Sequence, residues 1–196
     1  MNSTENTQSL KELILPPVVL TVICIVVSAL LVIAHDATYV DTTGVMTDKL
    51  TAGCREIFGE GDYTMLTETE EGKTLPVTFG EEGVDSVITD SGRELCLIEL
   101  THDGYATGGL HILVGFDSEG TVAGIAFISI GETPGLGTKV QGEDFLSQFK
   151  GFKAGDSTDG IDGVTAATYS SKGMKAAVAQ AADIYAEHRE EIFGGK

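Results

Sequence analysis

Four Ser and Thr hydroxyls crowd the ten residues DGVTAATYSS, which occupy positions 162 to 171. The alanine-rich run KGMKAAVAQAADIYAEH follows at once, and its composition is typical of a helix. One Ser or Thr is enough to cap the N–H groups that a helix leaves open at its start. A helix start also stabilises the negative charge of a phosphate, and further hydroxyls can donate to its oxygens. The hydroxyls belong to Thr165, Thr168, Ser170 and Ser171.

Two glycine-rich stretches stand earlier in the chain, GYATGG at 104–109 and ETPGLG at 132–137. One interpretation makes them turns, since the pair Pro134-Gly135 alone predicts one. The other is that glycine lets the backbone approach a flat or phosphorylated ligand closely. Neither stretch has the form GxGxxG after a strand in a βαβ unit, so the pattern gives no support for a dinucleotide fold.

The elements that must position these motifs are mainly strands. Four short runs rich in β-branched residues, VDSVITD, ELCLIELTHDG, GLHILVGFD and GTVAGIAFISI, are separated by turn signals. The last two form the best hairpin signal, and their pairing would bring both glycine-rich stretches to one end of the sheet. A juxtamembrane helix, a short helix over EDFLSQF and a long C-terminal helix are also expected. The C-terminal helix should bury one stripe, made of Met174, Val178, Ala181, Tyr185, His188 and Ile192.

The N-terminal part differs in kind from the rest. Positions 13–34 read LILPPVVLTVICIVVSALLVIA without a charge, and a bilayer core needs about 20 apolar residues. A cleaved signal peptide is the alternative, but its apolar region would be shorter, roughly 7–15 residues. Pro16 and Pro17 are expected in the first turn of the span, where they cost no hydrogen bond. Because Lys11 precedes the span and the next Lys or Arg is Lys49, the positive-inside rule favours a translocated domain.

Composition restricts the classes of function. With 30 acidic and 12 scattered basic residues the formal charge is −18, which argues against a nucleic-acid partner. Cys24 lies in the apolar span; Cys54 and Cys96 lack metal-site spacing and are expected to be thiols, with a disulfide between them as the alternative. His102 and His111 are expected to be solvent-facing or strand-face residues rather than ligands. The sequence shows neither a nucleophile–base pair nor a metal-ligand pattern, so no catalytic and no metal residue is predicted.

The three motifs combine in a recognisable order: GY-x-x-GG before a hairpin strand, ETPGLG after its partner and D-x-x-T-x-A-T before the final helix. Together they resemble the FMN-binding domain of the membrane redox complexes Rnf and Nqr, from the apolar span to about Ile192. Length and compact spacing look more like the G subunit of Rnf than the longer C subunit of the Na⁺-pumping NADH:quinone reductase. One position departs from the family pattern D-x-x-[ST]-G-A-T, because Ala166 replaces its glycine.

The resemblance implies a covalently bound FMN, joined through its phosphate to the hydroxyl of Thr168. Asp162 matches the leading acid of the pattern. The flavin transferase that installs FMN would read it, or it would bind a metal ion during transfer; a plain turn residue is the alternative. The other cofactor-binding residues implied are Thr165, Ala167, Ser170, Ser171, Tyr105, Gly108, Gly109, Glu132, Thr133, Leu136, Gly137 and Lys139.

The expected fold class is α+β, with a single N-terminal transmembrane helix followed by one FMN-binding domain that has an antiparallel sheet and flanking helices. The expected organisation is a cytoplasmic segment 1–12, a transmembrane helix 13–34, a juxtamembrane segment and helix 35–60, and an extracytoplasmic domain 61–196.

The resemblance implies an electron-transfer subunit of the ion-translocating ferredoxin:NAD⁺ oxidoreductase, the Rnf complex, in the cell membrane. Its partners would be membrane lipid, the other membrane and peripheral subunits, and the flavin transferase during maturation. As one subunit of a redox-driven translocase it would have no complete activity alone. The alternatives are a component like the C subunit of the Na⁺-translocating NADH:quinone reductase, a flavinylated extracytoplasmic reductase, and a non-redox anchored binding module.

Overall fold

The computed structural model describes residues 3–38, 44–70, 72–90 and 92–194. The chain divides into two units, with helix α1 in the first and every other element in the second. The predicted juxtamembrane segment includes residues 39–43, which lie outside the described residues.

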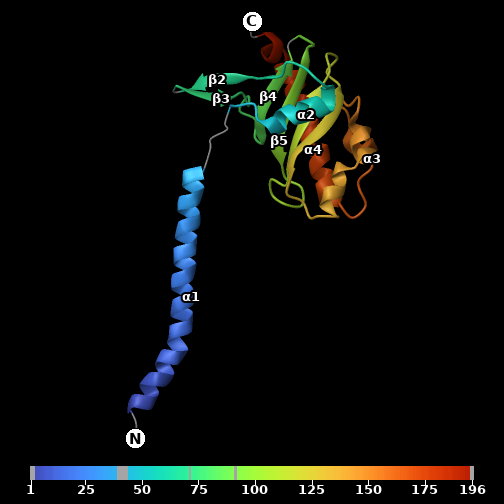
Figure 1. Ribbon diagram of the computed structural model, residues 1–196. Helices are drawn as coiled ribbons and strands as arrows, with labels where there is room; N and C mark the ends of the chain where they lie inside the picture. Colours follow the sequence, from blue (N-terminus) through green and yellow to red (C-terminus); the bar gives the residue numbers. More distant parts are fainter. Residues whose placement is uncertain (1–2, 39–43, 71, 91, 195–196) are drawn as a thin grey trace. The chain divides into compact units, whose positions relative to one another are not determined.

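Helix α1 runs from Ser3 to Thr38 (Figure 1). Its part Ile14–Thr38 contains an 18-residue window with a mean hydropathy of 3.0 and is long and apolar enough to cross a membrane. The helix begins well before the apolar run, so Pro16 and Pro17 lie in its interior and not in a first turn. This corrects the sequence expectation: the polar residues upstream continue the helix, although each proline removes one i→i−4 hydrogen bond.

The described part of the second unit contains one five-stranded antiparallel sheet in the order β1-β4-β5-β6-β7. The four long strands are those that the alternating runs predict, and β6 and β7 form the predicted hairpin. The sheet with its flanking helices confirms the α+β class. The strands are β1 (Thr64–Met65), β4 (Val84–Asp90), β5 (Leu95–His102), β6 (Leu110–Phe116) and β7 (Val122–Ile130).

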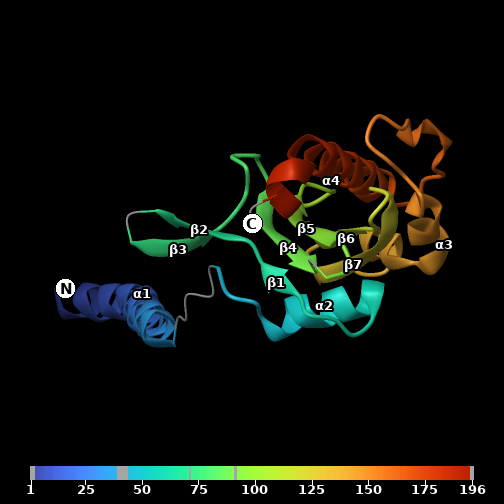
Figure 2. The same cartoon turned by 90° about the horizontal axis from the view of Figure 1, so that it is seen from above.

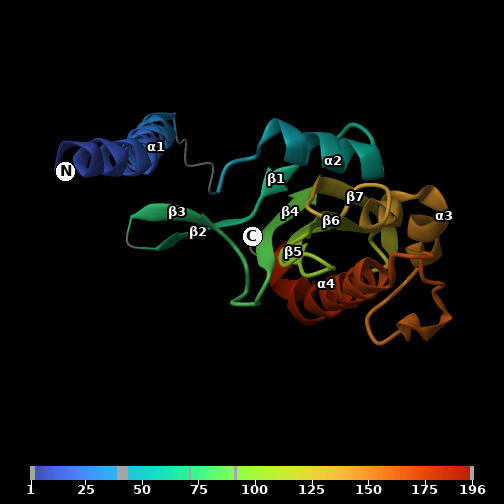
Figure 3. The ribbon, with the colours of Figure 1, turned by 90° about the horizontal axis from the view of Figure 1, so that it is seen from below.

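Helices cover both faces of this sheet (Figures 2 and 3). Helix α2 (Asp48–Phe58), the predicted juxtamembrane helix, packs on one face, and helix α4 (Thr168–Gly194) packs on the other. The predicted stripe of α4 is buried, except that His188 at its end is only half-buried. The His188 ring stacks on Phe79 at 4.1 Å between ring centroids, which confirms a packing role.

Short elements complete the second unit. A ribbon of two strands, β2 (Thr67–Glu70) and β3 (Lys73–Pro76), stands apart from the main sheet. The sequence did not predict it, because its charged residues show no apolar alternation. The predicted helix over EDFLSQF is one turn of α-helix, continued by a 3-10 turn. The remaining short helices are η1 (Gly137–Gln141), α3 (Glu143–Leu146), η2 (Ser147–Phe149) and η3 (Thr158–Gly160).

The sheet separates two apolar cores, and each contains one buried cysteine. Cys54 belongs to the core under α2, together with Leu97, whereas Cys96 belongs to the core under α4, together with Val178. Both cysteines are free thiols. The expectation of buried thiols is confirmed, and the alternative disulfide is wrong because the sheet lies between the two sulfur atoms.

Candidate functional site

The two glycine-rich loops and the start of α4 meet at one edge of the sheet. In the antiparallel ladder, His102 at the end of β5 pairs with Leu110 at the start of β6, and Leu110 pairs with Ile130 at the end of β7. The loop after β5 and the loop after β7 therefore leave the sheet side by side, and the N–H of Gly131 donates to the carbonyl of Gly109 at 2.8 Å. The predicted convergence of these two loops is confirmed.

A single buried carboxylate joins the three segments. Glu132 is 3% exposed, and its oxygens accept the N–H groups of Tyr105 at 3.2 Å and Ala106 at 3.1 Å. The hydroxyl of Ser170, in the first turn of α4, donates to the same carboxylate. Glu132 thus lies behind the site as a cross-link between loops. The cleft described below does not include it among its lining residues.

Three glycines leave the space that this carboxylate fills. A Cβ atom at Gly104, Gly109 or Gly137 would come closer than 3.0 Å to a carboxylate oxygen of Glu132. These positions need glycine because of a neighbouring side chain, a reason that neither sequence interpretation included. Gly135 does serve the predicted turn, since its φ is +72° and nothing lies within 4 Å of its missing Cβ.

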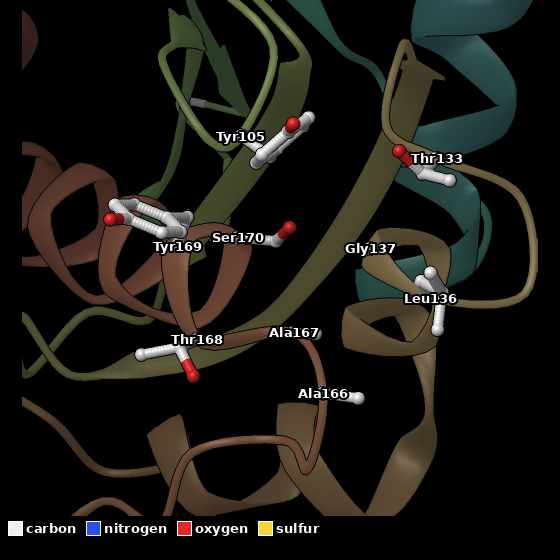
Figure 4. A pocket seen from close by; sticks show the side chains of 9 residues that line it. All are labelled: Tyr105, Thr133, Leu136, Gly137, Ala166, Ala167, Thr168, Tyr169 and Ser170. Carbon is white, nitrogen blue, oxygen red and sulfur yellow. The ribbon is translucent and has the colours of Figure 1, made fainter.

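The segments enclose a cleft of about 470 Å³ (Figure 4). Its size is within the range of small-molecule and cofactor sites. Three apolar or aromatic side chains form its exposed part: Tyr105 is 72% exposed, Tyr169 67% and Leu136 47%. The rings of the two tyrosines meet edge to face, with 6.2 Å between their centroids. The lining residues are Tyr105, Thr133, Leu136, Gly137, Ala166, Ala167, Thr168, Tyr169 and Ser170.

Thr168 is the first residue of α4, and its side chain is exposed at the cleft. The carbonyl of Ala167 accepts the N–H of Ser171 at 2.8 Å, which is the first hydrogen bond of the helix. The first N–H groups of any helix have no i−4 acceptor, and Ala167 has no side-chain oxygen to cap them. The helix start therefore offers free donors and the positive end of the macrodipole beside the Thr168 hydroxyl.

The two serines of the motif have different surroundings. Ser170 is buried at the base of the cleft and bonded to Glu132. Ser171 is buried away from the cleft, where its hydroxyl accepts the N–H of Val164 at 2.9 Å and so holds the preceding loop. The two serine hydroxyls thus fix the preceding loop and Glu132.

The remaining predicted residues lie outside the cleft lining. Thr165 and Asp162 are exposed in the loop before α4, and the N–H of Asp162 donates to Gln148 at 2.7 Å. Gly108 lies in the first glycine-rich loop, and its N–H donates to the Asp103 carboxylate at 2.6 Å. Gly109 is buried in the same loop, and Lys139 is exposed on η1.

Two lining residues were not predicted, Ala166 and Tyr169. Ala166 has a φ of +67°, a left-handed conformation that favours glycine. Its place in the motif, where the family pattern has glycine, was the available signal. Tyr169 follows Thr168 directly, but the sequence could not show that this first-turn side chain lies beside Tyr105.

A comparison with known families agrees with this geometry. The family model of the FMN-binding domain matches residues 104–183, a segment that contains both glycine-rich loops and the start of α4. Among solved structures, the chain is similar to the C subunit of the Na(+)-translocating NADH-quinone reductase from Parabacteroides distasonis. The two are 24% identical, the match covers 63% of this chain and 75% of that chain, and the TM-score is 0.42. None of the proteins with a curated description matches the chain.

Proposed function

We propose that the cleft holds one FMN, attached through its phosphate to Oγ1 of Thr168. One observation carries the proposal: an exposed hydroxyl stands at the open start of a helix, inside a cleft, within the segment that the FMN-binding family model matches. Attachment replaces the O–H bond of Thr168 by an O–P bond. The proton leaves, and a flavin transferase supplies the phosphate in activated form with its own leaving group.

The residues present fit this group. Free N–H donors in the first turn of α4 stabilise phosphate oxygens, and the macrodipole adds to this. The exposed faces of Tyr105 and Tyr169 and the side chain of Leu136 offer an aromatic and apolar surface to a planar ring system. Glu132 does not line the cleft and acts indirectly, because its carboxylate holds Tyr105 and Ser170 in place.

The cleft is suited to holding a redox group. FMN, when bound, supplies reversible electron transfer. The nine lining residues contribute hydroxyl, aromatic, apolar and backbone groups, so this chain anchors and orients its ligand. The function that this arrangement supports best is an electron carrier anchored to a membrane by α1.

We infer further that the protein is the flavin-bearing subunit of an ion-translocating ferredoxin:NAD⁺ oxidoreductase of the Rnf type. The three motifs and the apolar helix α1 support this inference. The domain after α1 would lie on the extracytoplasmic side, in contact with the other subunits. An Nqr-type NADH:quinone reductase is the alternative complex. Deletion of this chain should abolish ferredoxin-dependent NAD⁺ reduction by membranes, whereas loss of NADH:quinone activity instead would assign it to the Nqr type.

Attachment of the flavin can be tested by denaturing the protein. Full-length chain produced with a flavin transferase should fluoresce in a denaturing gel, and the peptide that contains Thr168 should gain the mass of one FMN. Thr168→Ala should abolish both signals. Its matched control, Thr165→Val, should reduce attachment without abolishing it, because Thr165 lies outside the cleft. Fluorescence that persists in Thr168→Ala would refute the assignment.

A further inference from the structure

A second polar cluster lies on the sheet face that α2 covers, and it is independent of the proposed flavin site. Asp85 on β4, Glu99 on β5 and His111 on β6 come from three adjacent strands. His111 Nε2 is 2.8 Å from Glu99 Oε1 and 3.7 Å from Asp85 Oδ2. One ligand atom from each residue lies within 4.8 Å of the other two. No sequence pattern marks this cluster, because the three residues meet only through strand pairing.

Each of the three side chains is oriented by a hydroxyl neighbour. Ser129 Oγ lies 3.3 Å from His111 Nδ1, where it can accept a hydrogen bond from a protonated Nδ1 when Nε2 binds a metal ion. The Ser86 hydroxyl donates to Glu99 Oε2 at 2.5 Å, and the Thr101 hydroxyl donates to Asp85 Oδ2 at 2.6 Å. Partners of this kind orient the ligands of metal sites, and they fix the tautomer of a ligating histidine.

The negative charge of the cluster favours the binding of a cation. Two carboxylates around a neutral imidazole carry two negative charges, and the Glu99 side chain is only 9% exposed. Among the described residues, His111 is the only basic side chain at ion-pair distance from either carboxylate. Without a metal, a proton on His111 offsets part of this charge. The hydrogen bond to Glu99 raises the pKa of the imidazole, although burial acts to lower it.

We propose that Asp85, Glu99 and His111 bind one divalent transition-metal cation of the Zn²⁺ class. A pocket of about 390 Å³ opens onto the three side chains and gives room for the ion and a water ligand. The imidazole nitrogen favours Zn²⁺ or Co²⁺ over Mg²⁺ and Ca²⁺, which prefer oxygen ligands alone. A bound ion would tie together three neighbouring strands beside the start of α2.

The test measures metal binding by the full chain in detergent after removal of metals with a chelator. Titration with ZnCl₂ should show one saturable equivalent and a rise in Tm, and MgCl₂ should produce neither. Loss of a residue that only hydrogen-bonds to a metal ligand weakens metal binding by roughly 10–100-fold. Asp85→Asn and His111→Gln remove ligands themselves, so each should weaken Zn²⁺ binding by more than this. Ser129→Ala, which removes only such a partner, should weaken it by about 10-fold.

His102→Gln is the matched control, since it makes the same change at a histidine that is not part of the cluster. It should leave Zn²⁺ affinity unchanged. Unfolding of every variant in chelator shows whether it still folds, and flavin attachment should be equal in all of them. The proposal is overturned if Zn²⁺ shows no saturable binding, or if Asp85→Asn and His111→Gln bind it as tightly as the unmodified chain.

Discussion

The side chain of Glu132 illustrates how one residue can hold a site without lining it. Its carboxylate accepts two backbone N–H groups and one hydroxyl from segments far apart in the chain. Glu132→Ala leaves one buried and two part-buried donors unpaired, and each buried unpaired group costs about 1–3 kcal/mol. The free energy of unfolding should therefore fall by about 1–3 kcal/mol, measured by denaturant titration. The same truncation at exposed Glu119 should change it by no more than about 0.5 kcal/mol.

Ala166 is one of three described non-glycine residues with a positive φ. At a φ of +67°, an L-residue is strained by its Cβ, and glycine is not. Ala166→Gly should therefore raise the free energy of unfolding by about 0.5–1 kcal/mol, after the greater flexibility of glycine in the unfolded chain is counted. The same substitution at Ala176, exposed inside α4, should lower it by about 1 kcal/mol. Equal signs for the two variants would contradict the strain at Ala166.

Asp90 gives the stability of the domain a defined pH dependence. Burial acts to raise its pKa, but the hydrogen bonds and ion pair with Arg93, together with the N–H of Asp62, lower it overall. In the unfolded chain the pKa of an aspartate is about 3.9, and at a pH above this value the ionised Asp90 stabilises the fold. This stabilisation is lost as the pH falls through the lower pKa that Asp90 has in the folded protein. The destabilisation by Asp90→Asn should therefore be largest near neutral pH and shrink below about pH 4. Asp183→Asn, on an exposed face of α4, should show no such trend.

The residues of the site were largely predictable from the sequence, but the separate role of each one was not. The motif identified Thr168 because a hydroxyl before a helix is visible in sequence. The role of Glu132 depends on donors from two other segments, which only the folded chain brings together. The same limit explains the cluster of Asp85, Glu99 and His111, whose members lie on separate strands.

At the scale of elements, helix α4 lies unusually close to the loop after β5. A Cβ atom at Gly173 would overlap the carbonyl oxygen of Asp103 and approach a methyl group of Leu110. Gly173→Ala should thus destabilise the domain by about 1–3 kcal/mol despite the better helix propensity of alanine. At Gly160 nothing lies within 4 Å of the missing Cβ, so Gly160→Ala should be close to neutral in the same denaturation experiment.

Element prediction succeeded where one face of the element is apolar. The four long strands and the buried stripe of α4 repeat apolar residues at the strand and helix periods, and the structure has both. The ribbon of β2 and β3 was missed because most of its residues are exposed on both faces. The start of α1 was missed because hydropathy marks the part of a helix that fits a membrane and not the part that continues in water.

At the scale of the whole molecule, the charges that flank α1 predict the side of the membrane on which the domain lies. Lys11 precedes the apolar run and Lys49 is the next Lys or Arg, which favours a cytoplasmic N-terminus. A reporter enzyme that works only outside the cytoplasm, fused after Lys196, should be active, and a reporter confined to the cytoplasm should not. The reverse result would contradict both the orientation and an extracytoplasmic relay of electrons.

The separation of the two cysteines by the sheet has a consequence for the folding of a newly made chain. Burial raises the pKa of the Cys54 thiol to about 12 and also raises that of Cys96, so the finished fold keeps both sulfurs protonated and unreactive. A chain still unfolded in an oxidising compartment has no such protection. A bridge closed there between Cys54 and Cys96 would hold together two residues that belong on opposite faces, and the sheet could not form between them. In a chain exported to an oxidising compartment, folding and oxidation would therefore compete, and only a chain that folds first would avoid the misplaced bridge.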